Sequence, residues 1–259
     1  MRNVEEIAWD LCCLFYENKP PINSNGELEY YLAGSLATLP MLCAERIQDL
    51  VVDENGVVVG VNEPVDIDNS VRTILQSYRR KINDSDYVFI KSSPSKVGLV
   101  DKINTQITDM SDLSDLGTKV IHISDPREQS CSYNVSVIYF KDKKIVIPSP
   151  IDIISFKLSQ CVGRKKVIQK RQLMEKSEKN ERIIQKNSEE YLRQLRDFIP
   201  LTMGVSKLYS AETIVARMRE IMESENNFDQ QIIEDIKSDL SDYPQITELF
   251  DGLNKGRKI

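Results

Sequence analysis

The chain has 259 residues, of which 41% are apolar and 29% charged, and its formal net charge is −6. These values are typical of a soluble globular protein with room for one large domain or two small ones. No apolar run approaches the roughly 18 residues of a membrane-spanning helix, and the first residues lack the apolar core of a signal peptide. We therefore expect a cytoplasmic protein with no membrane partner.

The single histidine and the five cysteines limit the kinds of catalytic and metal-binding site that we expect in this chain. His122 stands alone, no two cysteines have Cys-x-x-Cys spacing, and neither a Walker A loop nor a Gly-x-Gly-x-x-Gly motif occurs. These absences disfavour the usual zinc centres and a nucleophilic dyad of Cys or Ser with His. The odd cysteine count, with Cys12 next to Cys13, predicts reduced, buried thiols. If the chain is an enzyme, carboxylates with a metal are the best remaining chemistry.

The first 150 residues predict a mixture of helices and strands. Apolar residues at helical spacing predict helices over residues 4–17, 36–48 and 70–82. Asn55-Gly56 between two valine runs predicts a hairpin turn. Residues 104–118 are polar and predict a loop or a short helix. Runs of β-branched and aromatic residues predict strands over residues 28–33, 51–52, 57–59, 64–67, 87–90, 120–124, 135–140 and 145–147.

The pattern changes after Pro148-Ser149-Pro150, and from Asp152 onward it is only helical. Residues 157–196 contain twelve Lys/Arg and five Glu, a net charge of +7, whereas residues 211–251 contain three Lys/Arg and eleven Asp/Glu, a net charge of −8. The basic stretch is a solvated helix face in the simpler interpretation and an RNA-binding surface in the other. We therefore expect an α+β domain over residues 1–150 and an all-helical domain over residues 151–259.

The first domain contains a turn followed by a pair of carboxylates. Gly34-Ser35 ends one predicted strand, where glycine and a helix N-terminus favour a bound phosphate. Asp66 and Asp68 are two residues apart at the end of another predicted strand, so both face one side and suit Mg²⁺. Both features also have an ordinary explanation. Gly34-Ser35 fits a turn in which Ser35 caps the following helix. The Asp-x-Asp pair can arise by chance, because Asp84 and Asp86 form a second such pair.

Four segments in order resemble the polymerase-β-like nucleotidyltransferases, and within them the AbiEii-like toxin branch. They are Leu32–Ser35, Val65–Asp68, Val120–Ile123, and Ile147–Leu158 with Arg164 beyond it. The resemblance covers about residues 28–166. It implies a nucleotidyltransferase-like mixed sheet with flanking helices, and transfer of a nucleotidyl group from Mg-NTP to a hydroxyl of RNA, protein or a small molecule. The implied roles are triphosphate binding for Gly34 and Ser35, metal binding for Asp66 and Asp68, a third carboxylate for Asp125, and nucleotide contacts for Lys157 and Arg164.

The chain departs from the family pattern at three places. The family has its third metal-binding carboxylate on a later strand, which corresponds to the predicted strand over residues 120–124. The residue of that strand that faces the expected metal site is His122, so Asp125, just beyond the strand, is the substitute. His122 also fits a neutral, partly buried histidine. No acid follows Arg164 until Glu175, and Asn62-Glu63-Pro64 stands where the family has an Arg before its acidic pair. Two rival hypotheses follow: a catalytically inactive relative that binds a protein or RNA, and an interaction protein unrelated to nucleotides.

Overall fold

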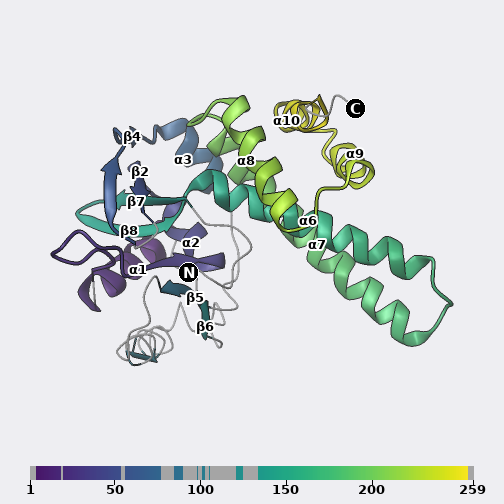
Figure 1. Cartoon of the computed structure of the whole chain (residues 1–259), viewed down its shortest axis with the longest axis horizontal. Coiled ribbons are helices and arrows are strands. Elements are labelled where there is room, and N and C mark those ends of the chain that lie inside the picture. Colours follow the sequence, from purple (N-terminus) through teal and green to yellow (C-terminus); the bar gives the residue numbers. More distant parts are fainter. Residues whose placement is uncertain are drawn as a thin grey trace. The chain divides into compact units, whose positions relative to one another are not determined.

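The chain forms two compact units, residues 1–150 and residues 151–259. A computed structural model, shown in Figure 1, describes residues 4–18, 20–53, 56–76, 85–89, 98, 101–102, 105, 121–124 and 134–255. The expected loop or short helix over residues 104–118 lies almost entirely outside these ranges. We describe each unit by itself.

The N-terminal unit has a mixed α+β fold built on two sheets. One sheet has the strand order β1-β5-β6, and the other has the order β3-β2-β7-β8 with the short strand β4 paired to β2. The pairings between neighbours are antiparallel except for that of β5 with β6. The strands are β1 (Tyr30–Ala33), β2 (Arg46–Val52), β3 (Val58–Val61), β4 (Val65–Asp66), β5 (Ser85–Phe89), β6 (Ile121–Ser124), β7 (Val135–Phe140) and β8 (Lys143–Pro148).

The helices of this unit are α1 (Val4–Asn18), α2 (Gly34–Met41) and α3 (Asn69–Gln76). The predicted helix over residues 36–48 is wrong in its second half, because α2 ends at Met41 and β2 begins at Arg46. Ile47 and Leu50 are buried on β2 and pair with residues of β7. Their β preference and this long-range pairing therefore override the helical spacing. Pro40 is the seventh residue of α2.

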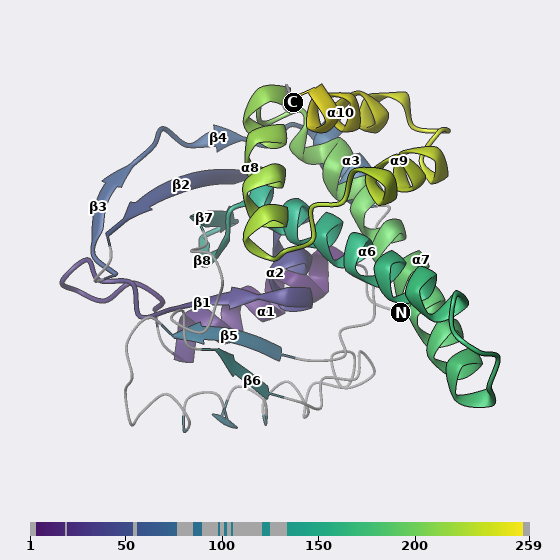
Figure 2. The same ribbon diagram turned by 45° about the vertical axis from the view of Figure 1, so that its right-hand side comes forward.

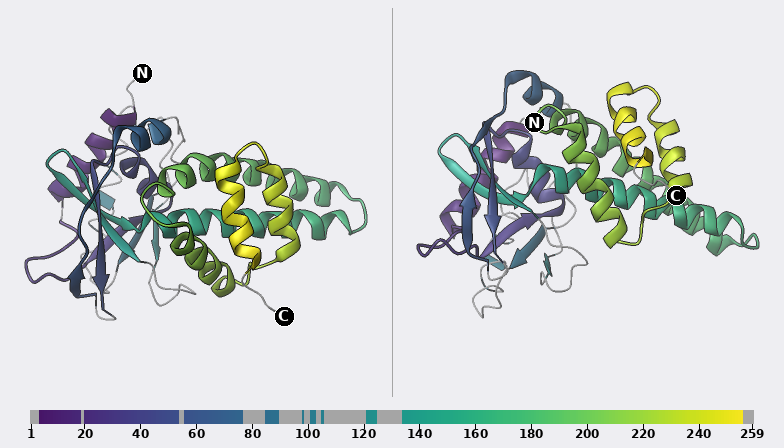
Figure 3. Two further views of the ribbon diagram at one scale, coloured as in Figure 1. Left: turned by 90° about the horizontal axis from the view of Figure 1, so that it is seen from above. Right: turned by 45° about the horizontal axis from the view of Figure 1, so that its top comes forward.

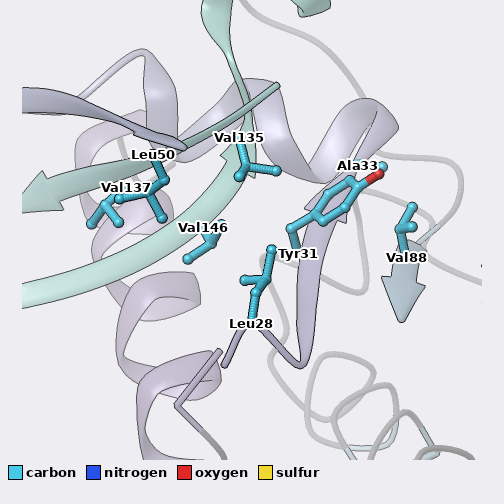
Figure 4. Packing of buried hydrophobic residues seen from close by; sticks show 8 residues of the cluster. All are labelled: Leu28, Tyr31, Ala33, Leu50, Val88, Val135, Val137 and Val146. Carbon is cyan, nitrogen blue, oxygen red and sulfur yellow. The ribbon is translucent and has the colours of Figure 1, made fainter. Parts of the chain in front are cut away.

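The two sheets share a core of aliphatic and aromatic side chains. Leu50 of β2, Val137 of β7 and Val146 of β8 lie in one cluster with Tyr31 of β1 and Val88 of β5. Figure 4 shows these side chains converging from both sheets, together with Leu28, Ala33 and Val135. Buried side chains of this size are the main stabilising contribution in such a unit. The cluster therefore fixes β1, and the turn that follows it, beside β8.

The C-terminal unit consists of five helices in its described part. They are α6 (Pro150–Gln172), α7 (Glu178–Val205), α8 (Ala211–Ser224), α9 (Gln230–Asp239) and α10 (Pro244–Lys255). Side chains at the N-caps start three of them: Ser177, Ser210 and Asp229 accept hydrogen bonds from the first turns of α7, α8 and α9. Pro148 and Pro150 each disfavour a helical conformation of the residue before them, which predicts a helix that begins only after Pro150. Helix α6 begins at Pro150 itself. Proline is well tolerated there, because the first N–H of a helix has no intrahelical partner.

Helices α6 and α7 form a long antiparallel hairpin, and its two halves differ. The half nearer Pro150 packs with α8, α9 and α10, and it buries Leu158, Phe198 and Leu201. The other half contacts α9 near its base, through Lys165 with Asp239 and Gln169 with Asp235. Its tip extends beyond those helices, as the teal end of Figure 1 and both views of Figure 3 show. We call residues 163–186 the basic hairpin. It contains nine Lys/Arg and three Glu, a net charge of +6.

Candidate functional site

Gly34 lies at a turn from a strand to a helix. It follows β1 and opens α2 with φ +56°, a value that favours glycine. Ala33 is the extended residue before the helix and has no side-chain group that could cap it. The first N–H groups of α2 are thus not capped by that residue, and a helix start of this kind suits an anion. Ser35 lies in α2, but its side chain is outside the described part of the structure.

Asp66 and Asp68 are both exposed, on either side of the buried Ile67, and only Asp66 lies within a strand. Asp66 belongs to β4, and its Oδ1 lies 4.0 Å from Nε of Arg46. Asp68 caps α3: its Oδ1 accepts hydrogen bonds from the backbone N–H groups of Ser70 at 2.7 Å and Val71 at 2.9 Å. One carboxylate is therefore exposed next to a cation, and the other stabilises a helix start.

The carboxylate pair and the Gly34 turn are at different places in the N-terminal unit. Strand β4 pairs with the edge of β2 that faces away from β7. Strands β2, β7 and β8 therefore lie between β4 and β1, which packs beside β8. Figure 2 shows β4 and α2 well separated. The structure does not bring Asp66 and Asp68 together with Gly34, because the sheet order that separates them is set by long-range strand pairing.

A metal centre at Asp66 and Asp68 does not fit the residues that surround them. Within the described ranges, no group of three or more His, Cys, Asp or Glu side chains is arranged to hold a metal ion. The guanidinium of Arg46 and the capping role of Asp68 both compete with a cation for these oxygens. The third position is not described: Asp125 lies outside the described residues, and His122 is described only as a backbone position on β6, paired with Asp86.

Lys157 and Arg164 both point from α6 to α7, as expected for residues two helical turns apart. Nζ of Lys157 lies 3.0 Å from Oδ2 of Asp197 and 3.2 Å from the side-chain oxygen of Gln194. Arg164 donates a hydrogen bond to Asn187 at 3.2 Å. Lys157 and Asp197 are both buried. The charge of Lys157 is therefore engaged by a carboxylate inside the helical unit, a contact that the expected role at a nucleotide phosphate did not include.

The strand that directly follows the Gly34 helix carries polar groups that the sequence reasoning missed. Asp49 of β2 accepts a hydrogen bond from the buried hydroxyl of Ser136 on β7. Gln48 accepts one from the hydroxyl of Tyr139 at 2.6 Å. Asp49 and Ser136 are direct cross-strand partners. Nothing in the local sequence indicates this pairing, because more than eighty residues separate the two strands.

The basic hairpin is the second candidate site. Lys170, Lys176, Lys179 and Lys186 are exposed, and no ion pair or hydrogen bond of theirs occurs within the described ranges. Other bases of the hairpin have partners: Lys165 binds Asp239 at 2.7 Å and Arg182 binds Glu178. The tip also exposes two apolar side chains, Leu173 at 90% and Met174 at 41%.

Burial makes two cysteines unsuited to nucleophilic chemistry. Burial raises the pKa of the Cys43 thiol and of the Cys161 thiol to about 12 in each case. Since the thiolate is the reactive form, both side chains are inert at neutral pH. This fits the expectation of buried thiols at these two positions.

Comparison with family models, with curated proteins and with solved structures yields no match to this chain. Across the described ranges, no helix has the length and apolar character needed to cross a bilayer. The function therefore has to be argued from the geometry of the chain itself.

Proposed function

We propose that this chain is an RNA-binding protein that contacts phosphates through the basic hairpin of α6 and α7. The observation that carries the proposal is the set of four exposed lysines without described partners, in a segment of net charge +6 within a chain of net charge −6. A lysine that makes no internal ion pair contributes little to folding, whereas it releases counterions when it meets a phosphate. The lysines are therefore better explained by an external anion than by the fold.

The arrangement of these bases suits a strand of phosphates. On α7, Lys179, Arg182 and Lys186 are spaced by three, four and seven residues, so they lie on one helix face over about 10 Å. On α6, Lys166 and Lys170 are four residues apart and share a face in the same way. The hairpin contains no aromatic side chain, so base stacking is not part of the proposal. We expect affinity with little sequence preference.

The test is a titration of full-length protein into labelled RNA, followed by fluorescence anisotropy at several salt concentrations. Replacing Lys170, Lys176, Lys179 and Lys186 by Ala should weaken binding. The slope of log affinity against log salt should become shallower by about 0.7 for each single-strand phosphate contact that is lost.

The matched control replaces four exposed bases outside the hairpin by Ala, namely Lys102, Lys144, Arg196 and Lys207. It removes the same charge, so an equal loss of affinity in both variants would refute the assignment to the hairpin. DNA of the same sequence reports whether the 2′-hydroxyl matters. Wild-type protein that does not bind RNA at low salt would end the proposal.

A second candidate is Mg-NTP binding with nucleotidyl transfer, the activity implied by the resemblance to nucleotidyltransferases. The observation that favours it is the positive φ of Gly34 at the start of α2, where the N-cap residue Ala33 makes no side-chain hydrogen bond to the helix. The described carboxylates do not form the expected two-metal arrangement, so we derive no reaction step. A thermal-shift screen with NTPs and Mg²⁺ tests it. A ligand at 100 times its Kd adds about 2.7 kcal/mol, and Gly34→Val should abolish the shift.

A further inference from the structure

The tip of the basic hairpin carries a feature that RNA binding does not explain. Leu173 is 90% exposed and Met174 is 41% exposed, between the bases of α6 and those of α7. Contact with a phosphate does not bury apolar surface, and exposure of an apolar side chain to water is unfavourable. A partner for this tip should therefore combine negative charge with apolar surface.

The exposed acids of α8, of α10 and of the turn before α10, which we call the α8–α10 face, offer this combination. Residues 211–251 have a net charge of −8. Glu212, Glu223, Asp242 and Glu248 are exposed and, within the described part of the chain, make no side-chain ion pair or hydrogen bond. Tyr243, next to Asp242 between α9 and α10, is 37% exposed and adds apolar surface there.

The base of the basic hairpin contacts α9 of its own chain, where Lys165 binds Asp239, but the tip of the hairpin lies beyond α8, α9 and α10. Both helices run without interruption through the basic hairpin, apart from the turn at its tip, and they point away from α9 and α10 (Figures 1 and 3). A lysine at the tip and an acid on α10 can therefore meet only if they belong to different molecules. The two surfaces differ, so their contact is a head-to-tail one.

We infer that the basic hairpin of one copy docks on the α8–α10 face of a second copy, with Leu173 as its apolar anchor near Tyr243. Charge complementarity selects the second copy as the occupant: four lysines without described partners on one surface meet four such acids on the other. This goes beyond the proposed function and does not depend on it. If RNA also binds the hairpin, the two partners exclude each other.

The first measurement is sedimentation velocity of the full-length protein over a range of concentrations. At about 0.1 M salt, where charges interact over about 10 Å, the average mass should rise with concentration. At about 1 M salt, where the range is about 3 Å, it should return to that of one chain of 29.7 kDa. A single-chain mass at every concentration in low salt would overturn the inference, as would association that is insensitive to salt.

The second measurement uses charge reversal. Lys170, Lys176, Lys179 and Lys186 changed to Glu in one variant, or Glu212, Glu223, Asp242 and Glu248 changed to Lys in another, should weaken association about tenfold or more. Leu173→Ser should also weaken it, and the four-alanine control with changes at Lys102, Lys144, Arg196 and Lys207 should not.

A mixture of the two charge-reversed variants decides between a second copy and an unrelated acidic partner. Each variant keeps one original surface and reverses the other, so the mixture brings a reversed hairpin to a reversed acidic face. Association should then return in the mixture while each variant alone stays a single chain. If the mixture also stays a single chain while far-ultraviolet circular dichroism shows both variants folded, the inference is wrong. Added RNA that lowers the mass of the wild type would support competition for the hairpin.

Discussion

The two halves of the α6–α7 hairpin use the same residue types for different purposes. In the packed half, the buried Lys157 of α6 binds the buried Asp197 of α7, and the buried Asp152 of α6 binds the buried Arg217 of α8. In the basic hairpin, lysines point into solvent with no described partner. Basic residues in one helical unit thus hold the fold together in one place and remain available to a partner in the other. The sequence alone does not distinguish the two kinds of basic residue, since both halves of the hairpin are predicted to be basic helix.

The largest difference between the two halves is expected in the unfolding free energy that is lost when an ion pair is removed. Asp152 is fully buried and accepts two hydrogen bonds of 2.8 Å from the guanidinium of Arg217, which raise the pKa of Arg217. Asp152→Ala should lower the free energy of unfolding by about 3–5 kcal/mol, because it removes the buried partner of Arg217 and leaves that guanidinium only the exposed carboxylate of Glu220. Urea unfolding followed by circular dichroism measures this.

The matched control is the exposed pair Arg182–Glu178 in the basic hairpin. Glu178→Ala should leave the unfolding transition unchanged within error, because exposed pairs contribute little. Equal losses in the two variants would remove the distinction between the halves. The double variant Asp152→Leu with Arg217→Met should recover most of the stability, since no buried charge remains unpaired.

A similar contrast is expected for apolar residues. Phe198 of α7 is fully buried, and its ring meets that of Phe250 edge to face at 6.3 Å. Phe198→Ala should cost about 3–5 kcal/mol of unfolding free energy through the lost burial and the cavity that it leaves. Leu173→Ala at the exposed tip should change it by less than about 0.5 kcal/mol. A large loss for Leu173→Ala would show that the tip is part of the core of its unit.

The sequence predicted the α+β character of the first 150 residues, the helical character of the rest, and most strands. The sequence-based prediction was wrong at residues 42–48, where apolar spacing predicted a helix. Ile47 instead pairs with Ile138 in a sheet, so part of this segment forms a strand. For the site, the turn at Gly34 was predictable because glycine adopts a positive φ more readily than other residues. The separation of Asp66 from that turn was not predictable, because it depends on β7 and β8, which follow much later in the chain.

The fate of Lys157 was not predictable for a different reason. Its spacing to Arg164 was read correctly as a common face, and both residues do contact α7. Whether that face meets a ligand or another helix depends on Asp197, which is forty residues away. A buried carboxylate opposite a lysine leaves no local sequence pattern, so no reading of residues 150–166 alone would find it.

The buried thiols provide a pH-dependent prediction for the packed regions. Burial holds the pKa of Cys43 and Cys161 at about 12, whereas an unfolded thiol titrates near 9.0. Below pH 9 both states keep these protons and the stabilisation is complete. Above pH 9 the unfolded state binds fewer protons than the folded state, so the unfolding free energy falls as pH rises, by up to about 1.4 kcal/mol per pH unit for each thiol.

Urea midpoints on both sides of pH 9 measure this effect, and Cys161→Ser should reduce the slope. A stability that stays constant between pH 8 and pH 11 would contradict burial of both thiols. The basic hairpin contains no cysteine, so charge variants there should leave the slope unchanged.

The smallest expected effect tests whether the two halves unfold together. Ser177 caps α7 at the exposed end of the hairpin by accepting a hydrogen bond from Asn180 N–H at 3.2 Å. Ser210 caps α8 in the packed region in the same way, with Thr213 N–H at 3.3 Å. Replacing such a cap by Ala typically costs about 1 kcal/mol. Ser210→Ala should therefore lower the global unfolding free energy by about that amount.

Ser177→Ala should behave differently, although the two hydrogen bonds are nearly identical. The end of the hairpin has few buried apolar contacts, and such segments open locally below the global unfolding free energy. The lost cap should then speed amide hydrogen exchange for about the first turn of α7 and leave the urea midpoint unchanged. If Ser177→Ala lowers the midpoint as much as Ser210→Ala does, the basic hairpin folds cooperatively with the packed helices. Its exposed lysines and Leu173 would then sit on a rigid arm, which would favour a preformed docking surface over one that orders on binding.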